Sequence, residues 1–586
     1  MQDMETKKII LESVKKAAKN VLGEVENEIS IEKPEKENLG DFSTNIALIL
    51  AGKLHKKPLD LANELADEIL SFDHTFKNES LTYPIFKTVQ VAAPGFINFY
   101  LSDEYLKHGI KEILKTGGKY GASNLGNNKK IIVEYSQPNP NKPMHIGHAR
   151  NNFLGSSLAE IFKFAGYDVL KVNYLNDWGT HICKSMLMYQ KYGKDRSPDQ
   201  KPDHFVGGFY IMYEQEIENN PELEKELSAM FIKLESGDPD TLELWKKITG
   251  WAYEGWEKTY KDENVDFDVW MYQSNYKETG KEIVKTAIER GIAEKDETGA
   301  VIARLEEYGI PDKVLLRKDG TSVYATQDMQ LAKDSYEKYA FEKRLYVVDN
   351  RQTDYFRQLF KILELLGFNW AKRLVHVGYG VVSLPEGGMS SRTGLVVNAD
   401  DVFSDILELE KEEIATSIKN IDAVEETVHK VALSAFRYGI LKVDPKQDIV
   451  FRTDQITKFE GNTGPYLLYT YARSQSVIEK SGRAGLNPDF QSLVRIGLHE
   501  KESFLLRGLL EFPDFIGQAV ERMSPHIVAS YLFEIAQRFN SFYGELSVLD
   551  APDDGTREQR IALCICTGQV LKNGLKLLGI DVVDKM

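Results

Sequence analysis

The amino-acid sequence predicts an α/β protein: a doubly wound parallel sheet, preceded by a smaller N-terminal α/β domain and followed by a C-terminal all-α helical bundle. In the middle of the chain a β-branched strand, a loop, a helix and a second strand follow one another, which is the order of a parallel βαβ crossover. From about Asp422 onward, apolar residues recur at helical spacing. At 586 residues the chain is also too long for one ordinary domain of roughly 100 to 200 residues.

The smaller α/β domain is expected at residues 1–124. Residues 1–17 mix apolar side chains with lysine and glutamate, as an amphipathic helix does and unlike the unbroken apolar core of a signal peptide. Helical periodicity over 46–70 precedes a short apolar strand at 88–92. Residues 117–130 are rich in Gly, Asn and Lys, which is typical of a linker to the next domain.

The sheet domain is expected at 125–400. Its first strand, 131–135, leads through a Pro- and Asn-rich loop into a helix at 145–165 and a second strand at 168–173. Because strands joined by such a helix lie parallel, this part predicts a Rossmann-like sheet. Two later strands and the helix between them have the same character: 345–349, 355–367 and 374–377.

An insertion and two C-terminal segments complete the expected domains. Residues about 191–300 are dense in Glu, Lys, Trp and Tyr with helical periodicity, and insertions of this size usually carry substrate contacts or lids. A connecting helical segment is expected at 401–424 and the helical bundle at 425–586. Apolar residues recur at helical spacing within the bundle at 428–441, 466–478, 501–512 and 528–542.

The net charge and the number of cysteines exclude several kinds of protein. The formal net charge of −16 excludes a general basic surface for nucleic acid, so any RNA contact must use a local basic face. Cys183, Cys564 and Cys566 are too few for a disulfide framework and lack zinc spacing, which favours a reducing compartment and no structural metal. No apolar stretch is long enough to span a bilayer, and we expect a soluble, unsecreted protein.

The most informative stretch follows the first strand of the sheet domain and contains His145, Gly147 and His148. Two histidines three residues apart at the start of a helix lie where nucleotides bind to parallel sheets. Gly147 leaves room for a purine ring, and both histidines can donate hydrogen bonds to an α-phosphate as charge builds up on it. The alternative is that the histidines only cap or cover the helix.

A second stretch, far downstream, is a basic and hydroxyl-rich loop at 387–394. Its residues Met389, Ser390, Ser391 and Arg392 suit a loop that closes on a polyphosphate, although alone they would be an ordinary surface loop. With both motifs in this order, the chain resembles the class I aminoacyl-tRNA synthetases, whose hallmarks are His-Ile-Gly-His and a Lys-Met-Ser-Lys-Ser loop.

The closer resemblance is to the arginyl-tRNA synthetases, and it covers essentially the whole chain. It rests on four further stretches, at 40–45, 174–180, 319–328 and 459–466. The resemblance implies an arginine-tRNA ligase of the cytoplasm that uses ATP with Mg²⁺ to activate L-arginine and then esterifies it onto the 3′ adenosine of tRNA(Arg) in protein synthesis. We expect a monomer without a membrane partner. The family also usually needs bound tRNA for activation.

Residues with a physical reason to bind a guanidinium match the family's arginine pocket. The five fixed donors of arginine need carboxylates and a flat partner, which a single point charge does not supply. Glu134, Tyr324 and Asp328 match the positions that hold the side chain of arginine, and Asn139 and Gln352 match those that hold its amino and carboxyl end. The alternative for Glu134 and Asp328 is an ion pair or a helix cap.

The second loop departs from the family pattern. Gly388 stands where a lysine often precedes Met389, so the loop lacks its first cation. We hypothesise that Lys142 supplies positive charge from the other side of the phosphates, while Arg392 supplies the positive charge of the loop itself. If Lys142→Ala kept near-normal adenylate formation, this hypothesis would be wrong.

By the same resemblance, the N-terminal domain contacts the tRNA elbow and the helical bundle binds the anticodon. Two stretches of the bundle, 436–439 and 469–473, interleave aromatics with arginine, a pattern that can clamp unpaired bases but is often just core. About a third of these aromatics are expected at the RNA surface.

Two other kinds of protein share part of this pattern. A small nucleotidylyltransferase also carries a His-x-Gly-His pair on a doubly wound sheet, but it would be far shorter and would need no helical bundle. A synthetase-like RNA-binding subunit that has lost catalysis is favoured only by the altered Met389 loop.

Overall fold

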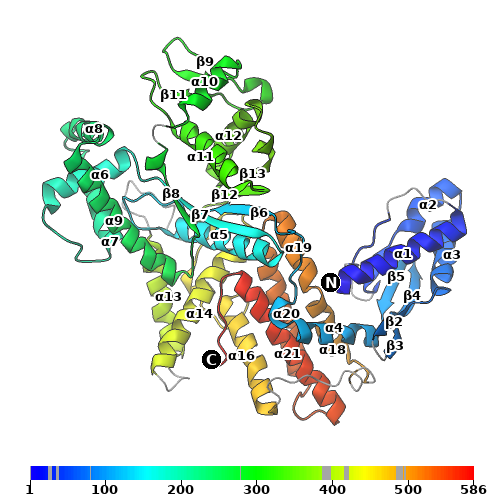
Figure 1. The fold of residues 1–586 in the computed structure, drawn as a ribbon. Helices are drawn as coiled ribbons and strands as arrows, with labels where there is room; N and C mark the ends of the chain where they lie inside the picture. Colours follow the sequence, from blue (N-terminus) through cyan, green and yellow to red (C-terminus); the bar gives the residue numbers. More distant parts are fainter. Residues whose placement is uncertain are drawn as a thin grey trace.

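The computed structural model describes residues 2–23, 29–34, 39–78, 81–276, 279–383, 385, 397–414, 421–482, 493 and 496–586. Figure 1 shows a central parallel sheet, an N-terminal unit to one side, inserted helices on the opposite side and a large helical bundle beneath. The fold class predicted from the sequence is confirmed. No helix among the described residues is long and apolar enough to cross a membrane.

The N-terminal unit is a three-stranded antiparallel sheet in the order β1-β5-β4, with helices packed on it. The helical stretch expected at 46–70 forms two helices, because His55 adopts a left-handed conformation and Pro58 starts a new helix. The elements are α1 (Gln2–Leu22), β1 (Phe42–Thr44), α2 (Ile46–Leu54), α3 (Pro58–Leu70), β2 (Thr75–Asn78), β3 (Leu81–Pro84), β4 (Phe86–Ala92), β5 (Phe96–Leu101) and α4 (Asp103–Thr116).

The central sheet has five parallel strands in the order β13-β12-β6-β7-β8. Alternate residues of β6 point to opposite faces: Ile131 packs in the core shared with α5, whereas Ile132 packs with α12. The elements are β6 (Lys130–Glu134), α5 (Ile146–Phe164), β7 (Asp168–Leu175), β8 (Val269–Tyr272), α11 (Tyr324–Tyr339), β12 (Lys343–Asp349), α12 (Thr353–Leu365) and β13 (Leu374–Tyr379). The strand order reverses between β6 and β12, the place where doubly wound sheets bind ligands.

The expected insertion is divided by a strand of the sheet. Strand β8 lies within 191–300 and forms the edge next to β7, which separates a helical excursion from a smaller one. Four residues without alternating polarity give too short a pattern to predict such a strand. The first excursion holds α6 (Thr180–Met188), α7 (Pro202–Glu216), α8 (Glu222–Glu235) and α9 (Pro239–Asp262), and the second holds α10 (Lys281–Glu289), β9 (Ala293–Lys295), β10 (Val301–Ala303) and β11 (Lys313–Leu316).

Among the described residues after 397, β15 (Ile449–Val450) is the one strand, and it pairs with β14 (Val382–Ser383). The helical stretch expected at 501–512 ends at Leu510, and a new helix starts at Phe512 with Pro513 in its first turn. The helices are α13 (Ala399–Ile414), α14 (Ile421–Leu441), α15 (Thr453–Ile456), α16 (Gly464–Ser481), α18 (Glu500–Leu510), α19 (Phe512–Arg522), α20 (His526–Glu545) and α21 (Asp554–Leu577).

Of the two stretches that interleave aromatics with arginine, 436–439 is core, which is the alternative that the sequence left open. Phe436 and Tyr438 are fully buried, and Arg437 between them donates hydrogen bonds to the carbonyl oxygens of Glu263 and Leu578. This stretch therefore joins the bundle to the sheet domain and does not face RNA. In the other stretch Tyr471 is buried, and Tyr469 is exposed.

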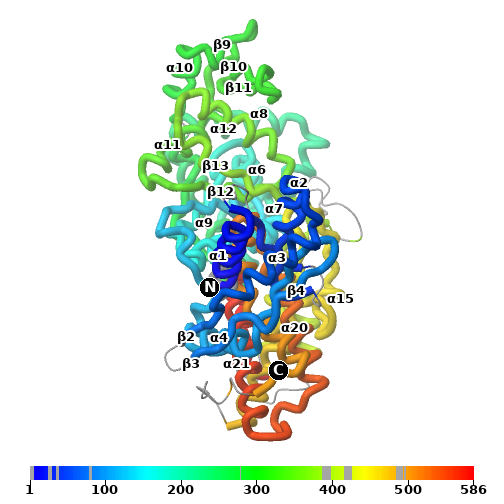
Figure 2. Tube along the Cα trace, turned by 90° about the vertical axis from the view of Figure 1, so that its right-hand side faces the viewer, coloured from blue at the N-terminus to red at the C-terminus, as the bar shows by residue number. Residues whose placement is uncertain are grey.

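The N-terminal unit docks on the bundle through charged side chains. The Lys33 ammonium lies 3.0 Å from the Glu511 carboxylate, and Arg507 forms an ion pair with Asp41. The buried Lys107 ammonium donates to the carbonyl oxygen of Leu493 at 3.0 Å. Figure 2 shows the same arrangement from the side, with the N-terminal unit in front of α20 and α21.

Candidate active site

A cavity of about 850 Å³ opens at the ends of β6 and β12, beside the point where the strand order reverses. All the residues predicted to bind arginine line it: Glu134, Asn139, Tyr324, Asp328 and Gln352. They come from β6, the loop after it, α11 and the turn after β12, which are far apart in the sequence. The structure therefore brings this predicted set together in one place.

One of the carboxylates that line the cavity belongs to a buried ion pair. Glu134, at the end of β6, pairs with Arg344 of β12, and both side chains are almost completely shielded from solvent. Gln137 donates from Nε2 to the other carboxylate oxygen of Glu134 at 2.9 Å. Glu134 therefore does form an ion pair, as the alternative stated. Its carboxylate also lines the cavity and retains lone pairs that can accept hydrogen bonds from a ligand.

Asp328 is the second carboxylate of the cavity, and the Tyr355 hydroxyl donates a hydrogen bond to it. Burial, helped by the negative charge of Glu134, raises the pKa of Asp328 to about 7, although the hydrogen bond from Tyr355 lowers it. The Lys313 ammonium lies 4.5 Å from the centre of the Tyr355 ring. A cation placed beside Asp328 would lower its pKa and relieve the cost of the buried charge.

Sequence reasoning missed Arg344, Tyr355 and Lys313. Each is a single residue within a strand or helix pattern, so no motif marked it. The buried strand containing Arg344 gave the one available signal, because a cation in an apolar strand needs a buried acidic partner.

The loop after β6 has a strained backbone. Ser136 and Gln137 have φ angles of 77° and 52°, a region that side chains other than glycine seldom adopt. Two asparagine side chains hold this shape: Asn151 accepts from the Ser136 N–H at 2.7 Å, and Asn173 accepts from the Gln137 N–H at 3.1 Å. The loop that carries Gln137 and Asn139 into the cavity is therefore fixed from beneath.

His145 and His148 cap α5 through one ring nitrogen each. His145 Nδ1 accepts from the Gly147 N–H at 3.1 Å, and His148 Nδ1 accepts from the His145 N–H at 3.1 Å. Since both Nδ1 atoms are acceptors, the neutral rings carry their proton on Nε2. The capping alternative is thus correct, and it leaves an N–H donor on each ring for a ligand.

Burial keeps both rings neutral. Burial, with the charges of Lys142 and Arg351, lowers the pKa of His145 to about 4. Burial, with the nearby His145 and Lys142, also holds the pKa of His148 well below its usual value. Two neutral imidazoles with centres 3.9 Å apart can therefore both donate to one anionic group.

Lys142 adds a positive charge beside the two rings. Its ammonium forms no hydrogen bond or ion pair with any residue that the structure describes, and burial lowers its pKa. An ammonium close to the capped N-terminus of α5 makes a favourable environment for phosphate.

Met389, Ser390, Ser391 and Arg392 lie outside the described residues, as does Gly388. The chain that follows them is described: Asn398 forms a backbone bridge with His145, and the Ile146 N–H donates to the Val397 carbonyl at 3.2 Å. The sequence just beyond the second loop thus lies against the first motif.

Comparison with known families accounts for the three parts of the chain. A model of the class I (R) tRNA synthetase catalytic domain matches residues 109–453. A model of the DALR anticodon binding domain matches 467–586, and one of the arginyl tRNA synthetase N terminal domain matches 5–101.

Whole-chain relatives agree with these models. An arginine–tRNA ligase of Bacteroides fragilis is 39% identical, over 84% of this chain and 86% of the relative. One of Clostridium perfringens is 34% identical over 100% of both chains. The solved arginyl-tRNA synthetase of Thermus thermophilus matches with a TM-score of 0.78 and 25% identity, over 99% of this chain and 100% of the other.

The resemblance read from the motifs is therefore confirmed, and a short nucleotidylyltransferase does not account for matches over the full length. The relatives are named arginine–tRNA ligases, which favours an enzyme over a noncatalytic RNA-binding subunit. The structure is consistent with this family. It has a doubly wound sheet with two capping histidines and an acidic cavity where the strand order reverses. The flanking domains also match models of this family. The chain belongs to the arginyl-tRNA synthetases, the class I aminoacyl-tRNA synthetases that ligate arginine to tRNA.

Proposed function

We propose that the cavity of about 850 Å³ binds L-arginine and that its two carboxylates, Glu134 and Asp328, hold the guanidinium. The observation that carries this assignment is Asp328: its carboxylate accepts a hydrogen bond from Tyr355, has no cation within ion-pairing distance among the described residues, and has a raised pKa. A planar fork satisfies two separated carboxylates, which one ammonium does not. Lysine would leave buried acceptors unpaired.

The remaining predicted residues have separate tasks in this proposal. Tyr324 begins α11 at the rim of the cavity and is 52% exposed, so its ring can cover a bound side chain. Asn139 and Gln352, which line the same cavity, bind the amino and carboxyl end of arginine.

ATP is proposed to lie against Gly147 with its α-phosphate near His145 and His148. A carboxylate oxygen of arginine attacks the α-phosphorus, and pyrophosphate leaves. The Nε2–H groups and the Lys142 ammonium stabilise the charge that develops on the phosphate. Near-normal adenylate formation by Lys142→Ala would refute the role of Lys142. Mg²⁺ would enter with ATP as part of the substrate.

In the second step a ribose hydroxyl of the terminal adenosine attacks the carbonyl carbon of the adenylate, and AMP leaves. We assign the residues 1–124 to the tRNA elbow, 125–400 to catalysis, 401–424 to a connection and 425–586 to the anticodon. Met389, Ser390, Ser391 and Arg392 remain assigned to the ATP phosphates. A monomer in the cytoplasm, where its free cysteines stay reduced, fits this role.

A groove of about 1270 Å³ on the bundle is the proposed place for anticodon bases. Its exposed Tyr469 lies 4.7 Å from the Arg473 guanidinium, and Tyr543 lies 5.4 Å from the same group. An arginine between two aromatic rings offers flat surfaces and positive charge for unpaired bases. The groove as a whole is not basic, because its four Lys and Arg side chains are matched by four Asp and Glu side chains. The positive charge offered to a base between the two rings is that of Arg473.

The arginine assignment is tested by Asp328→Asn with calorimetric binding of arginine. Removing one partner of a shielded charge pair costs about 2–5 kcal/mol, so arginine affinity should fall roughly 30-fold or more. Asp334→Asn is the matched control, because Asp334 lies on the same helix α11 but does not line the cavity. Unchanged arginine affinity in Asp328→Asn would refute the assignment.

A further inference from the structure

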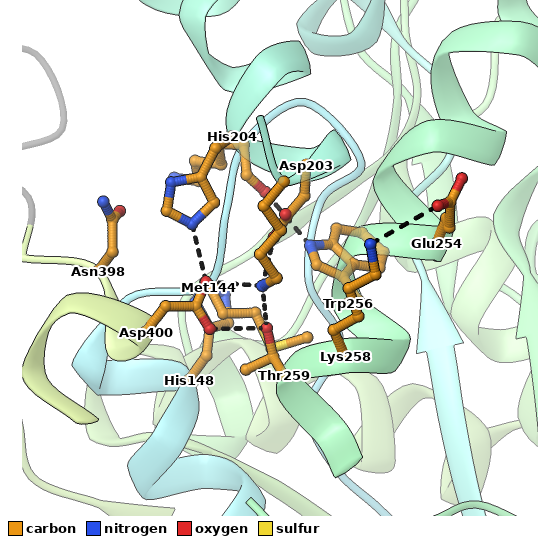
Figure 3. Close-up of polar contacts among 12 residues, drawn as sticks. Met144, His148, Asp203, His204, Glu254, Trp256, Lys258, Thr259, Asn398 and Asp400 are labelled. Carbon is orange, nitrogen blue, oxygen red and sulfur yellow. Dashed lines mark hydrogen bonds and ion pairs between the residues drawn. The ribbon is translucent and has the colours of Figure 1, made fainter. Parts of the chain in front are cut away.

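A polar cluster outside the cavity joins the inserted helices to the chain beside His145. Lys201, Asp203 and His204 stand at the start of α7, Thr259 lies in the last turns of α9, and Asp400 lies in the first turn of α13. Figure 3 shows Asp203, His204, Thr259 and Asp400 directed toward one another from these three helices. None of these residues has been given a task above.

Both carboxylate oxygens of Asp400 accept hydrogen bonds. Oδ2 accepts from Lys201 Nζ at 2.6 Å and from His204 Nε2 at 2.7 Å, and Oδ1 accepts from Thr259 Oγ1 at 3.0 Å. Burial alone would raise the pKa of Asp400, but the hydrogen bond from His204 and the charge of Lys201 outweigh it, and the pKa lies below its usual value. Asp400 is thus an ionised anchor held by two helices of the insertion.

The cluster is not assigned to a metal ion. Ligand atoms of Asp203, His204 and Asp400 lie within 4.8 Å of one another, which is close enough for a cation. The Lys201 ammonium already supplies that cation, at 2.6 Å from Asp400 and 3.3 Å from Asp203. The positive charge between the helices is therefore part of the chain.

On its other side, Asp400 continues the segment that lies against the first motif. The Ala399 N–H donates to the Met144 carbonyl at 2.9 Å, the Ile146 N–H donates to the Val397 carbonyl at 3.2 Å, and Asn398 forms a bridge with His145. Fixing Asp400 therefore fixes the backbone next to the histidine that caps α5.

The same two helices contact the residues before His145. Trp256 of α9 donates from Nε1 to the Lys142 carbonyl at 3.4 Å. A Cβ on Gly207 of α7 would stand 2.6 Å from Pro143 Cδ, so the backbone of α7 touches the chain there. The inserted helices thus contact the residues before the histidine motif and, through Asp400, the segment that lies against it.

We propose that Lys201, His204 and Thr259 are positioning residues for adenylate formation: by fixing Asp400 they set the backbone at Met144–Ile146 and so the direction of the histidine Nε2–H groups. The proposal rests on the assignment of His145 and His148 to ATP. If the proposal is correct, changes in the cluster alter the rate of adenylate formation, whereas the affinity for arginine in the separate cavity does not change.

Thr259→Val tests this, because it removes one hydroxyl and keeps the shape of the side chain. Breaking its hydrogen bonds to Lys201 and Asp400 should lower kcat of arginine-dependent ATP–pyrophosphate exchange, measured with saturating tRNA, about tenfold. KM for arginine should not change, and Thr259→Ser should restore kcat. The matched control is Thr249→Val on the same helix, whose hydroxyl bonds only within α9.

A second pair of variants decides the matter even if Thr259→Val folds poorly. A glutamine side chain reaches the Nε2 position of histidine and an asparagine does not, so His204→Gln should keep kcat and His204→Asn should lose it. Normal kcat in Thr259→Val and His204→Asn, while His148→Asn is impaired, would overturn this proposal alone. Equal losses in Thr249→Val, or a matching rise of KM for arginine, would also overturn it. A fully active His148→Asn would instead overturn the ATP assignment.

Discussion

At the residue scale, the two ring nitrogens of His148 have separable tasks. Nδ1 caps α5, and Nε2 is the atom that we propose donates to the phosphate. We expect His148→Asn, which keeps an acceptor at the Nδ1 position, to retain the stability of the protein but to lose about 100-fold in kcat of adenylate formation. His148→Gln should keep part of the activity and lose about 1 kcal/mol of stability.

Thermal unfolding and ATP–pyrophosphate exchange on the two variants check this division. The reverse order, with the asparagine variant active and the glutamine variant inactive, would assign the catalytic role to Nδ1 or to the cap itself.

Asp328 makes arginine binding depend on pH. Its pKa of about 7 means that the carboxyl is largely protonated below pH 7, and that proton must leave before the guanidinium can pair with it. Arginine affinity should therefore fall by up to about tenfold per pH unit below about 7 and level off above it. Calorimetry in buffers of different ionisation enthalpy should detect the released proton near pH 6. In Asp328→Asn the dependence should disappear, and a flat profile in the unaltered protein would contradict the account.

At the element scale, the strained loop after β6 depends on α5 beneath it. The Asn151 side chain accepts from the Ser136 N–H and donates to the Val347 carbonyl at 2.8 Å. Asn151→Ala should leave these buried groups unpaired, lower the free energy of unfolding by about 1–3 kcal/mol and raise KM for arginine. Denaturant unfolding and exchange kinetics measure both effects. A loss of stability without any change in KM would show that the shape of this loop does not affect arginine binding.

The elements that the sequence predicted best are those with a long, regular pattern. The strand–helix–strand unit of β6, α5 and β7 was predictable because buried β-branched runs flank a helix with a start signal. Strand β8 was not, since four residues carry no period, and neither was the division of 46–70 at His55. The burial of Phe436 and Tyr438 depends on helices that join them only in the folded protein.

The site residues, too, divide into those that a sequence pattern marks and those that only the folded structure brings together. Glu134 and Asp328 were found through motifs that the family shares, whereas Arg344 and Tyr355 bind to them across strands and helices distant in sequence. The cluster around Asp400 has no motif at all, because its members come from two helices of the insertion and from α13, which only packing brings together. A single sequence contains no signal for such contacts.

At the scale of the whole molecule, the ion pair of Asp41 with Arg507 docks the N-terminal unit on the bundle. Asp41 also accepts from the Leu101 N–H at 2.7 Å within its own unit. Asp41→Asn should loosen this docking and raise KM for tRNA several-fold, because surface and interface charge pairs are worth about 1 kcal/mol. Arginine affinity should not change. Filter binding of tRNA and calorimetry with arginine measure the two quantities, and a loss of arginine affinity would contradict the separation of tasks.

For the molecule as a whole we propose that one chain joins arginine, selected by an acidic cavity, to tRNA through an adenylate made at two capping histidines. The most direct measurement is charging of total tRNA with each labelled amino acid in turn, with ATP and magnesium, for the unaltered protein and for His148→Asn. The account predicts esterification of arginine alone and its loss in the variant. Charging with another amino acid, or arginine charging that survives in His148→Asn, would contradict it.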